Sequence, residues 1–252
     1  MTRIVVYPHS MASSGAKEVA RGLGAKRVHP DGAYWPRRGD LIINWGSSHS
    51  PQWNMRMELL RTIPLNHWAS VQSAINKLKA FVVFRSFNVP HVPFTTRQDV
   101  ALKWLAEGQK VIGRHKLTGT GGEGIEFITP DSLVCPLYTQ LIPKKREFRV
   151  HVFRGKMIDA SQKKKKRGVE ADPYIKSHDR GWVFCNENVE VPKKVEEAAI
   201  QAVKALGLDF GGVDVLYCRQ TDSPFVLEVN TAPGLEGGRI ESYVKAFQSL
   251  VG

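Results

Sequence analysis

The sequence is most informative at Phe225-Val226-Leu227-Glu228-Val229-Asn230-Thr231-Ala232-Pro233-Gly234-Leu235-Glu236-Gly237. The first half of this stretch is an apolar run interrupted by polar residues at every second position, which is typical of a β-strand. Successive side chains of a strand point to opposite faces, so we expect Glu228 and Asn230 to share one face, with apolar residues packed behind them.

A second apolar run, residues 212–217, carries Asp214 in a similar setting. Two carboxylates and an amide that face one another offer the oxygen ligands of a Mg²⁺ site of the kind that holds a nucleotide triphosphate. The alternative is two ordinary core strands whose polar residues are solvated, as they usually are in strands. The rest of the chain favours the metal site, and Asp214, Glu228 and Asn230 are its predicted ligands.

Composition narrows the class of protein. The chain has 252 residues, 42% of them hydrophobic, and can bury the core of one large domain or of two to three lobes. No run approaches the roughly 20 apolar residues of a membrane span, so no membrane association is expected. The formal net charge of +12 indicates an anionic partner, either nucleotide phosphates or a polyanion such as nucleic acid.

The three cysteines, Cys135, Cys185 and Cys218, are odd in number and far apart, without the spacing of metal ligands. This usage fits a reducing cytoplasm and predicts buried, inert thiols. The cytoplasm is therefore the expected location.

Periodicity and turn residues predict the order of elements. A small α/β unit comes first, with strands at 4–7 and 40–46 and a helix at 13–23. One amphipathic helix at 71–87 and an extended connection at 88–94 follow. The remaining prediction is a helix at 99–107, strands at 110–114, 125–128, 133–142, 147–154 and 157–161, a polar segment at 163–179, and a helix at 195–206.

The glycine-rich loop at 118–124 fits the pattern G-x-G-x-x-G. A dinucleotide-binding fold needs a helix after those glycines, whereas residues 125–128 alternate like a strand. The loop therefore joins two antiparallel strands, where its backbone N–H groups can lie over phosphates. Protein kinases also carry such a loop, and Asp209-Phe210-Gly211 spells their magnesium motif. No His-Arg-Asp motif is present, and a kinase leaves Glu228 and Asn230 unexplained, so we reject that interpretation.

From about residue 76 to residue 238 the chain resembles the ATP-grasp superfamily of carboxylate–amine ligases, most closely its ribosomal-protein glutamate ligase and glutathione synthetase branch. Residues 230–237 are close to the terminal motif of that branch. The resemblance implies an α/β (α+β) ATP-grasp fold, in which two antiparallel-sheet lobes enclose ATP beside a small N-terminal α/β lobe. The expected domains are the N-terminal lobe at 1–75, a central lid with the glycine loop at 76–140, and a C-terminal lobe with the magnesium site at 141–252.

The resemblance also implies the cofactors, ATP and Mg²⁺. Asp214, Glu228 and Asn230 would bind two magnesium ions between the β- and γ-phosphates, and Mn²⁺ could substitute. Phosphate contacts fall to Lys77, to the loop residues Thr120, Gly121 and Gly122, and to Arg114, where the family usually has a lysine. The backbone of Gln140, Leu141 and Ile142 would hold adenine, and Glu147 the ribose.

Catalytic and substrate roles follow from the same resemblance. Arg149 is a candidate for the acyl phosphate or the substrate carboxylate, assisted by Arg114 and by Lys163, which replaces the arginine usual in the next strand. Substrate contacts fall to His178, Arg180, Gly234 and Glu236. The stretch Ser177-His178-Asp179-Arg180-Gly181-Trp182 lacks the asparagine and one glycine of the branch's Asn-x-His-x-Gly-Gly loop, which leaves the acceptor open. As alternatives, Arg149 is a surface partner of Glu147 and His178 is merely solvated.

The predicted activity is ATP-dependent amide formation through an acyl phosphate, with release of ADP and phosphate. Its substrates would be a small-molecule carboxylate and an amine. The basic runs at 144–146 and 163–167 further predict a rim for an anionic acceptor, a peptide or a nucleic acid, unless they form a solvated face. Two other classes remain open, a phosphotransferase that acts on a hydroxyl and a nucleotide-binding module without turnover. The oligomeric state is not predicted.

Overall fold

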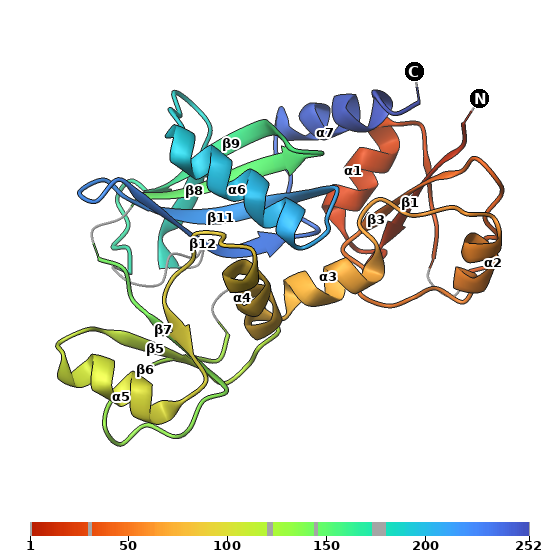
Figure 1. Ribbon diagram of the computed structural model, residues 1–252. Coiled ribbons are helices and arrows are strands. Elements are labelled where there is room, and N and C mark those ends of the chain that lie inside the picture. Colours follow the sequence, from red (N-terminus) through yellow and green to blue (C-terminus); the bar gives the residue numbers. More distant parts are fainter. Residues whose placement is uncertain (1, 30–31, 120–122, 144–145, 173–179, 252) are drawn as a thin grey trace.

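A computed structural model describes residues 2–29, 32–119, 123–143, 146–172 and 180–251. Three separate sheets organise the chain, each with its own helices (Figure 1). Within these ranges, no helix combines the length and the apolar character that crossing a membrane requires.

The N-terminal sheet is parallel, in the order β2-β1-β3. Its elements are β1 (Ile4–Pro8), α1 (Ser14–Gly22), β2 (Lys26–Arg27), β3 (Leu41–Trp45) and α2 (Asn54–Leu59). Helix α1 begins where the side chain of Ser13 accepts a hydrogen bond from the backbone N–H of Ala16 at 3.3 Å, a typical N-cap. The last helix, α7 (Arg239–Gln248), was not expected from the sequence; it packs beside α1 (Figure 1) and so brings the end of the chain onto this lobe.

The single helix predicted at 71–87 is two helices, α3 (Trp68–Ile75) and α4 (Lys77–Ser86). Asn76 separates them because its backbone is extended, with φ −92° and ψ 109°, and its side chain accepts from the N–H of Lys79 at 3.0 Å. An asparagine that caps a new helix ends the preceding one. Phe81 and Phe84 of α4 are buried in the same core as helix α6 (Lys193–Ala205) and the C-terminal sheet.

The second sheet is antiparallel in the order β4-β7-β5-β6, and α5 packs against it (Figure 1). Its elements are β4 (Phe94–Thr95), α5 (Gln98–Ala106), β5 (Val111–Arg114), β6 (Ile125–Phe127) and β7 (Leu137–Gln140). The strand predicted at 133–142 is thus shorter, because Pro136 lacks a backbone donor, and Leu133 and Val134 are 77% and 70% exposed. Strands β5 and β6 form the hairpin that carries the glycine loop, as expected.

The third sheet is antiparallel in the order β10-β9-β8-β11-β12. Its elements are β8 (Arg146–Phe153), β9 (Lys156–Lys165), β10 (Trp182–Cys185), α6 (Lys193–Ala205), β11 (Phe210–Cys218) and β12 (Ser223–Asn230). Helix α6 lies along one face of this sheet (Figure 1), where it buries the alternate apolar residues of β8 and β11. Strand β9 continues past Ser161, so Lys163 and Lys165 belong to a strand paired with β10, not to the predicted polar segment.

Asn66 joins the N-terminal lobe to the third sheet. It is fully buried with φ +58°, and its side-chain oxygen accepts from the N–H of Asp209 at 2.8 Å. The Asp209 carboxylate accepts in turn from the N–H of Asn66 at 3.0 Å. Asp209 therefore has a structural role in a loop between helix and strand, which agrees with the rejection of the kinase interpretation.

Candidate active site

A row of charged side chains crosses the face of the third sheet that α6 leaves uncovered. Asp214 on β11 stands directly opposite Arg149 on β8 and Glu228 on β12. Arg149 donates from Nε to Oδ1 and from Nη2 to Oδ2 of Asp214, both at 2.7 Å, in the bidentate geometry that suits a guanidinium and a carboxylate. The two side chains are 16% and 6% exposed, so the surface-pair alternative for Arg149 is wrong.

Charge attraction keeps this buried pair ionised. Burial works against the charged form of Asp214, but the charge and hydrogen bonds of Arg149, together with the charge of Lys163, outweigh it and lower the pKa of the carboxyl below its usual value. Burial likewise works against the charge of Arg149, whose pKa is nevertheless raised by Asp214, with smaller contributions from Glu228 and Glu147. The site therefore holds a carboxylate and a guanidinium at neutral pH.

Glu228 and Asn230 lie next to this pair on β12, on one face as the alternation predicted. The side-chain N–H of Asn230 donates to Glu228 Oε1 at 3.5 Å and to the Gly212 carbonyl at 3.3 Å. Lys77 places Nζ 3.4 Å from Glu228 Oε2 and donates to the carbonyl of Gly119 at 3.2 Å. Lys77 thus connects β12 to the start of the glycine loop.

The donor chemistry of Asp214, Glu228 and Asn230 fits a magnesium ion. All three offer oxygen atoms from neighbouring strands, and Mg²⁺ prefers such ligands. Arg149 hydrogen-bonds both oxygens of Asp214, but each carboxylate oxygen has a second lone pair for a cation. Glu228 is 35% exposed along its side chain and is open to a ligand.

Lys163 and Glu147 form a second ion pair on the same face. Lys163 Nζ lies 2.5 Å from Glu147 Oε1, and the two side chains are 11% and 7% exposed. The ring of Phe184 on β10 lies under both cations of the site, 4.3 Å from Arg149 Cζ and 5.0 Å from Lys163 Nζ. Cation–π contacts of this kind hold Arg149 and Lys163 in place. Phe184 is not among the predicted site residues, because the sequence pattern does not predict β10.

Arg114 ends β5 at the base of the glycine-loop hairpin. Within the described ranges its buried Nε has no hydrogen-bond partner. Burial lowers the pKa of the guanidinium, and the Glu228 carboxylate opposes that shift, which places Arg114 within electrostatic reach of the site. A partly buried arginine with an unused donor is suited to an anionic ligand.

Other predicted site residues have different surroundings. The N–H of Gln140 donates to the carbonyl of Pro93 at 3.1 Å, and the N–H of Leu141 donates to that of Lys110 at 2.8 Å. The backbone N–H groups of both residues are therefore already paired, so the backbone contact to adenine predicted here would have to use their carbonyl groups. Ile142 packs against the core of the third sheet. The loop residues Thr120, Gly121 and Gly122, and also His178, lie outside the described residues.

The described substrate candidates lie on two segments: Arg180 lies just before β10, and Gly234 and Glu236 follow β12. Arg180 is exposed and pairs with Asp172 at 2.8 Å. Gly234 has no atom within 4 Å of the position a Cβ would take, and Glu236 is exposed in the same loop after β12. The described contacts do not bring Arg180 together with this loop.

Two polar residues near Arg149 were not predicted. Ser161 on β9 stands opposite Arg149, and its fully buried hydroxyl has no partner within the described ranges. His151, one alternation further along β8, makes a hydrogen bond of 3.0 Å with the hydroxyl of Tyr243. Burial first, and then the charges of Arg239 and Arg149, lower the pKa of His151 to about 3. A histidine in a predicted strand carries no sequence signal that separates such a core position from a ligand.

Comparisons with known proteins agree with this architecture. Residues 137–250 match the family model of the RimK-like ATP-grasp domain. A protein named probable alpha-L-glutamate ligase from Teredinibacter turnerae is 28% identical over 244 residues, which span 90% of this chain and 77% of the relative. The structure resembles D-alanine–D-alanine ligase from Bacillus anthracis, with a TM-score of 0.69, 15% identity, and coverage of 100% and 96% of the two chains. It also resembles the ATP-grasp ligase PsnB complexed with a phosphomimetic variant of its minimal precursor, Mg and ADP, with a TM-score of 0.68, 15% identity, and coverage of 99% and 98%.

The three sheets and their order are those of the ATP-grasp fold, so the predicted fold class is confirmed. The chain is an ATP-grasp ligase. Residues 137–250 carry a RimK-like ATP-grasp domain, and relatives named probable alpha-L-glutamate ligase are 26% and 28% identical to the chain, so the family resemblance predicted from the sequence is confirmed.

Proposed function

We propose that the protein joins a carboxylate to an amine through an acyl phosphate, with cleavage of ATP to ADP and phosphate, and that glutamate is one of its substrates. The names of the similar proteins support glutamate. The observation that supports this chemistry is the row of Arg149, Asp214 and Glu228, with Lys77 beside Glu228. The two carboxylates can bind a metal ion, and the neighbouring side chains of Arg149 and Lys77 can bind phosphate and carboxylate groups. The row contains no nucleophile paired with a base.

In this proposal Asp214, Glu228 and Asn230 hold two magnesium ions. The ions would stabilise the charge that develops on the transferred phosphoryl group. Lys77 and Arg114 bind phosphate oxygens from the side of the glycine loop, together with Thr120, Gly121 and Gly122. The adenine lies against 140–142, and Glu147, which Lys163 holds in place, orients the ribose.

Arg149 is proposed to orient the reacting carboxylate. The guanidinium has five N–H donors, and the bond to Asp214 uses one on Nε and one on Nη2. The remaining donors on Nη1 and Nη2 can bind a substrate carboxylate or acyl phosphate without breaking that ion pair. Because phosphoryl transfer depends on charge neutralisation and positioning, fixed cations and metal ligands suffice for this chemistry.

An anionic acceptor remains part of the proposal. Lys163 does not contribute to the basic rim, because it pairs with Glu147. Lys164, Lys165 and Arg167 are exposed at the end of β9 and support such a rim, while Lys144 and Lys145 lie outside the described residues. These cations favour an acidic peptide or nucleic acid that carries the amine, with an attraction that salt screens.

The test is a turnover assay with ATP, Mg²⁺, glutamate and pooled acidic peptides or nucleic acid, in which ADP, phosphate and product mass are measured. Glu228→Gln keeps the shape of the side chain and removes a charge. Turnover should fall by about 100-fold or more if the ion stabilises the transferred phosphoryl group. The control Glu197→Gln removes a carboxylate from the exposed surface of α6, where Glu197 is 60% exposed, and should leave turnover unchanged.

Each contrary result identifies an error in the proposal. ADP formed without free phosphate indicates transfer to a hydroxyl, and absence of ADP with every substrate pool indicates a binding module. Near wild-type turnover by Glu228→Gln removes Glu228 from the metal site.

A further inference from the structure

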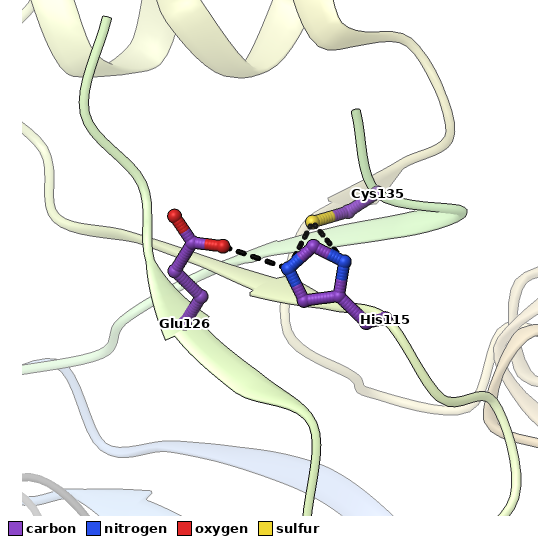
Figure 2. Close-up of side chains that lie close together, drawn as sticks. All are labelled: His115, Glu126 and Cys135. Atoms are coloured by element: carbon purple, nitrogen blue, oxygen red, sulfur yellow. Dashed lines mark hydrogen bonds and ion pairs between the residues drawn. The ribbon is translucent and has the colours of Figure 1, made fainter. Parts of the chain in front are cut away.

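A second cluster of metal-ligating side chains lies in the sheet that carries the glycine loop. His115 follows β5, Glu126 lies in β6, and Cys135 precedes β7, and Figure 2 shows the three side chains pointing toward one another. His115 Nε2 is 2.7 Å from Glu126 Oε2 and 3.5 Å from Cys135 Sγ. One ligand atom from each residue lies within 4.8 Å of the other two. The three come from separate segments, which is why the cysteine spacing in the sequence gave no sign of a metal site.

Neighbouring residues shape the position of each ligand. A Cβ on Gly113 would lie 2.6 Å from Cys135 Sγ, so a glycine is required beside the sulfur. Ser132 donates its hydroxyl to Glu126 Oε1 at 2.6 Å, which leaves Oε2 toward His115. The backbone N–H of Cys135 donates to the hydroxyl of Tyr138 at 2.7 Å. Supporting hydrogen bonds of this kind typically orient the ligands of metal sites.

We propose that His115, Glu126 and Cys135 bind a transition-metal ion of the Zn²⁺ class. Imidazole nitrogen, carboxylate oxygen and thiolate sulfur are the three ligand types of protein zinc sites. A tetrahedral ion with bonds of about 2.0–2.1 Å to nitrogen and about 2.3 Å to sulfur separates those two atoms by roughly 3.5 Å. The separation of Nε2 and Sγ is 3.5 Å. The thiolate excludes Mg²⁺ and Ca²⁺, which prefer oxygen, from this site.

Two adjustments accompany binding. The pair His115–Glu126 is at hydrogen-bond distance and opens by roughly 0.7 Å, because the ion replaces the proton between nitrogen and oxygen. That proton leaves to solvent, or the imidazole keeps its proton on Nδ1 while Nε2 binds the ion. The thiol of Cys135, whose pKa burial and then Glu126 raise, loses its proton to solvent as the metal–sulfur bond forms. The side chains of His115 and Glu126 are 38% and 37% exposed, which gives the ion a route in and leaves room for a water as fourth ligand.

The location gives the site a structural consequence. His115 and Glu126 lie on the two arms of the hairpin that carries the glycine loop, and the N–H of His115 donates to the carbonyl of Gly124 at 2.9 Å. Cys135 belongs to the segment that enters β7. A bound ion therefore fixes the hairpin to its neighbouring segment at the base of the glycine loop.

The test uses the full chain titrated with Co²⁺ as a spectroscopic probe, and with Zn²⁺ against a chromophoric chelator, in the presence of excess Mg²⁺. We expect one Co²⁺ per chain with a thiolate-to-cobalt charge-transfer band, which ligands at Asp214 and Glu228 cannot produce. Cys135→Ser should abolish the band and weaken Zn²⁺ binding by about 100-fold or more, since even loss of a supporting hydrogen bond costs about 10–100-fold. Ser132→Ala, which removes only that support from Glu126, should weaken binding by about 10-fold.

Cys218→Ser is the matched control, because Cys218 is also a buried thiol and lies at the end of β11. It should keep both the band and the affinity. Circular dichroism of Cys135→Ser without metal establishes that the variant is folded. Absence of the charge-transfer band in the wild-type chain, or its retention in Cys135→Ser, overturns the proposal and leaves the trio as a hydrogen-bonded brace of the hairpin.

Discussion

Replacing Arg149 with methionine removes the cation of the buried pair while keeping a long side chain. Asp214 is 6% exposed and accepts both of its short hydrogen bonds from Arg149, so the variant leaves a buried carboxylate without its main partner. Breaking a buried pair in this way typically costs about 3–5 kcal/mol in the free energy of unfolding. We expect a loss in that range for Arg149→Met.

The partner variant, Asp214→Asn, should be less damaging. Arg149 then keeps the attraction of Glu228 and Glu147 and the contact with the ring of Phe184. We expect a loss of about 1–3 kcal/mol, which is the cost of leaving a buried polar group poorly satisfied. The double variant Arg149→Met/Asp214→Asn buries no unpaired charge at this position and should lose less than Arg149→Met alone.

Urea unfolding of the four proteins, without nucleotide, measures these values, and its pH dependence tests the cause. In the wild-type chain the pKa of Asp214 is lowered, so its contribution to stability is present above the unfolded-state pKa and is lost as pH falls through the folded one. Without Arg149, burial raises that pKa, so the deficit of Arg149→Met should shrink as the pH is lowered and Asp214 takes up a proton. A deficit below about 0.5 kcal/mol at neutral pH, typical of a surface substitution, would falsify the ion-pair argument, as would a deficit that does not change with pH.

Three further predictions concern the scaffold. Asn66→Ala removes the side chain that joins the N-terminal lobe to Asp209 and should cost about 1–3 kcal/mol for each buried partner left unsatisfied, measured by urea unfolding; a loss below 1 kcal/mol would contradict it. His151 has a folded-state pKa of about 3, so below the ordinary histidine pKa of about 6.5 only the unfolded chain takes up a proton there, and the protein loses stability. His151→Gln should therefore reduce the fall in unfolding free energy between pH 6.5 and 5 by up to about 2 kcal/mol. An unchanged slope of stability against pH would refute this. Gly46→Ala should lower the free energy of unfolding by about 2 kcal/mol or more, because the residue has φ +82° and its new Cβ would lie 2.6 Å from that of Ala232. The control Gly39→Ala has φ +86° but no atom within 4 Å, so only the backbone strain should reduce its stability. Equal losses in urea unfolding would show that the contact with Ala232 contributes nothing.

Most of the fold could be predicted from the sequence, because the alternation of apolar and polar residues marks each strand and helix locally. Alternation of apolar and polar residues located β11 and β12, and it placed Glu228 and Asn230 on one face. Local signals failed where a single capping residue decided the outcome. Asn76 splits an apolar pattern that reads as one helix, because its side chain caps α4. Strand β10 was missed because its partner β9 looked like a solvated lysine run.

Only the part of the candidate site that depends on local periodicity was predictable from the sequence. The row of charges follows from strand periodicity, but the bidentate bond between Arg149 and Asp214 depends on the register of β8 against β11, which joins residues 65 positions apart. The trio of His115, Glu126 and Cys135 likewise depends on strand pairing. The spacing of the three cysteines predicted only that Cys135 is a buried, unreactive thiol.

The contacts of Lys77 bear on the order in which ligands enter the site. Two carboxylates, Asp214 and Glu228, face three cations, Arg149, Lys77 and Arg114, so this part of the site carries a surplus of positive charge. At the proposed metal site, a free divalent ion would meet that surplus of positive charge and would compete with Lys77 for Glu228. A bound triphosphate would offer negative charge to Lys77 and Arg114, and would thereby free Glu228 for the ion. If Glu228 binds metal as proposed, divalent ions should therefore bind more tightly with nucleotide than without it, because phosphate oxygens would take over the contact of Lys77.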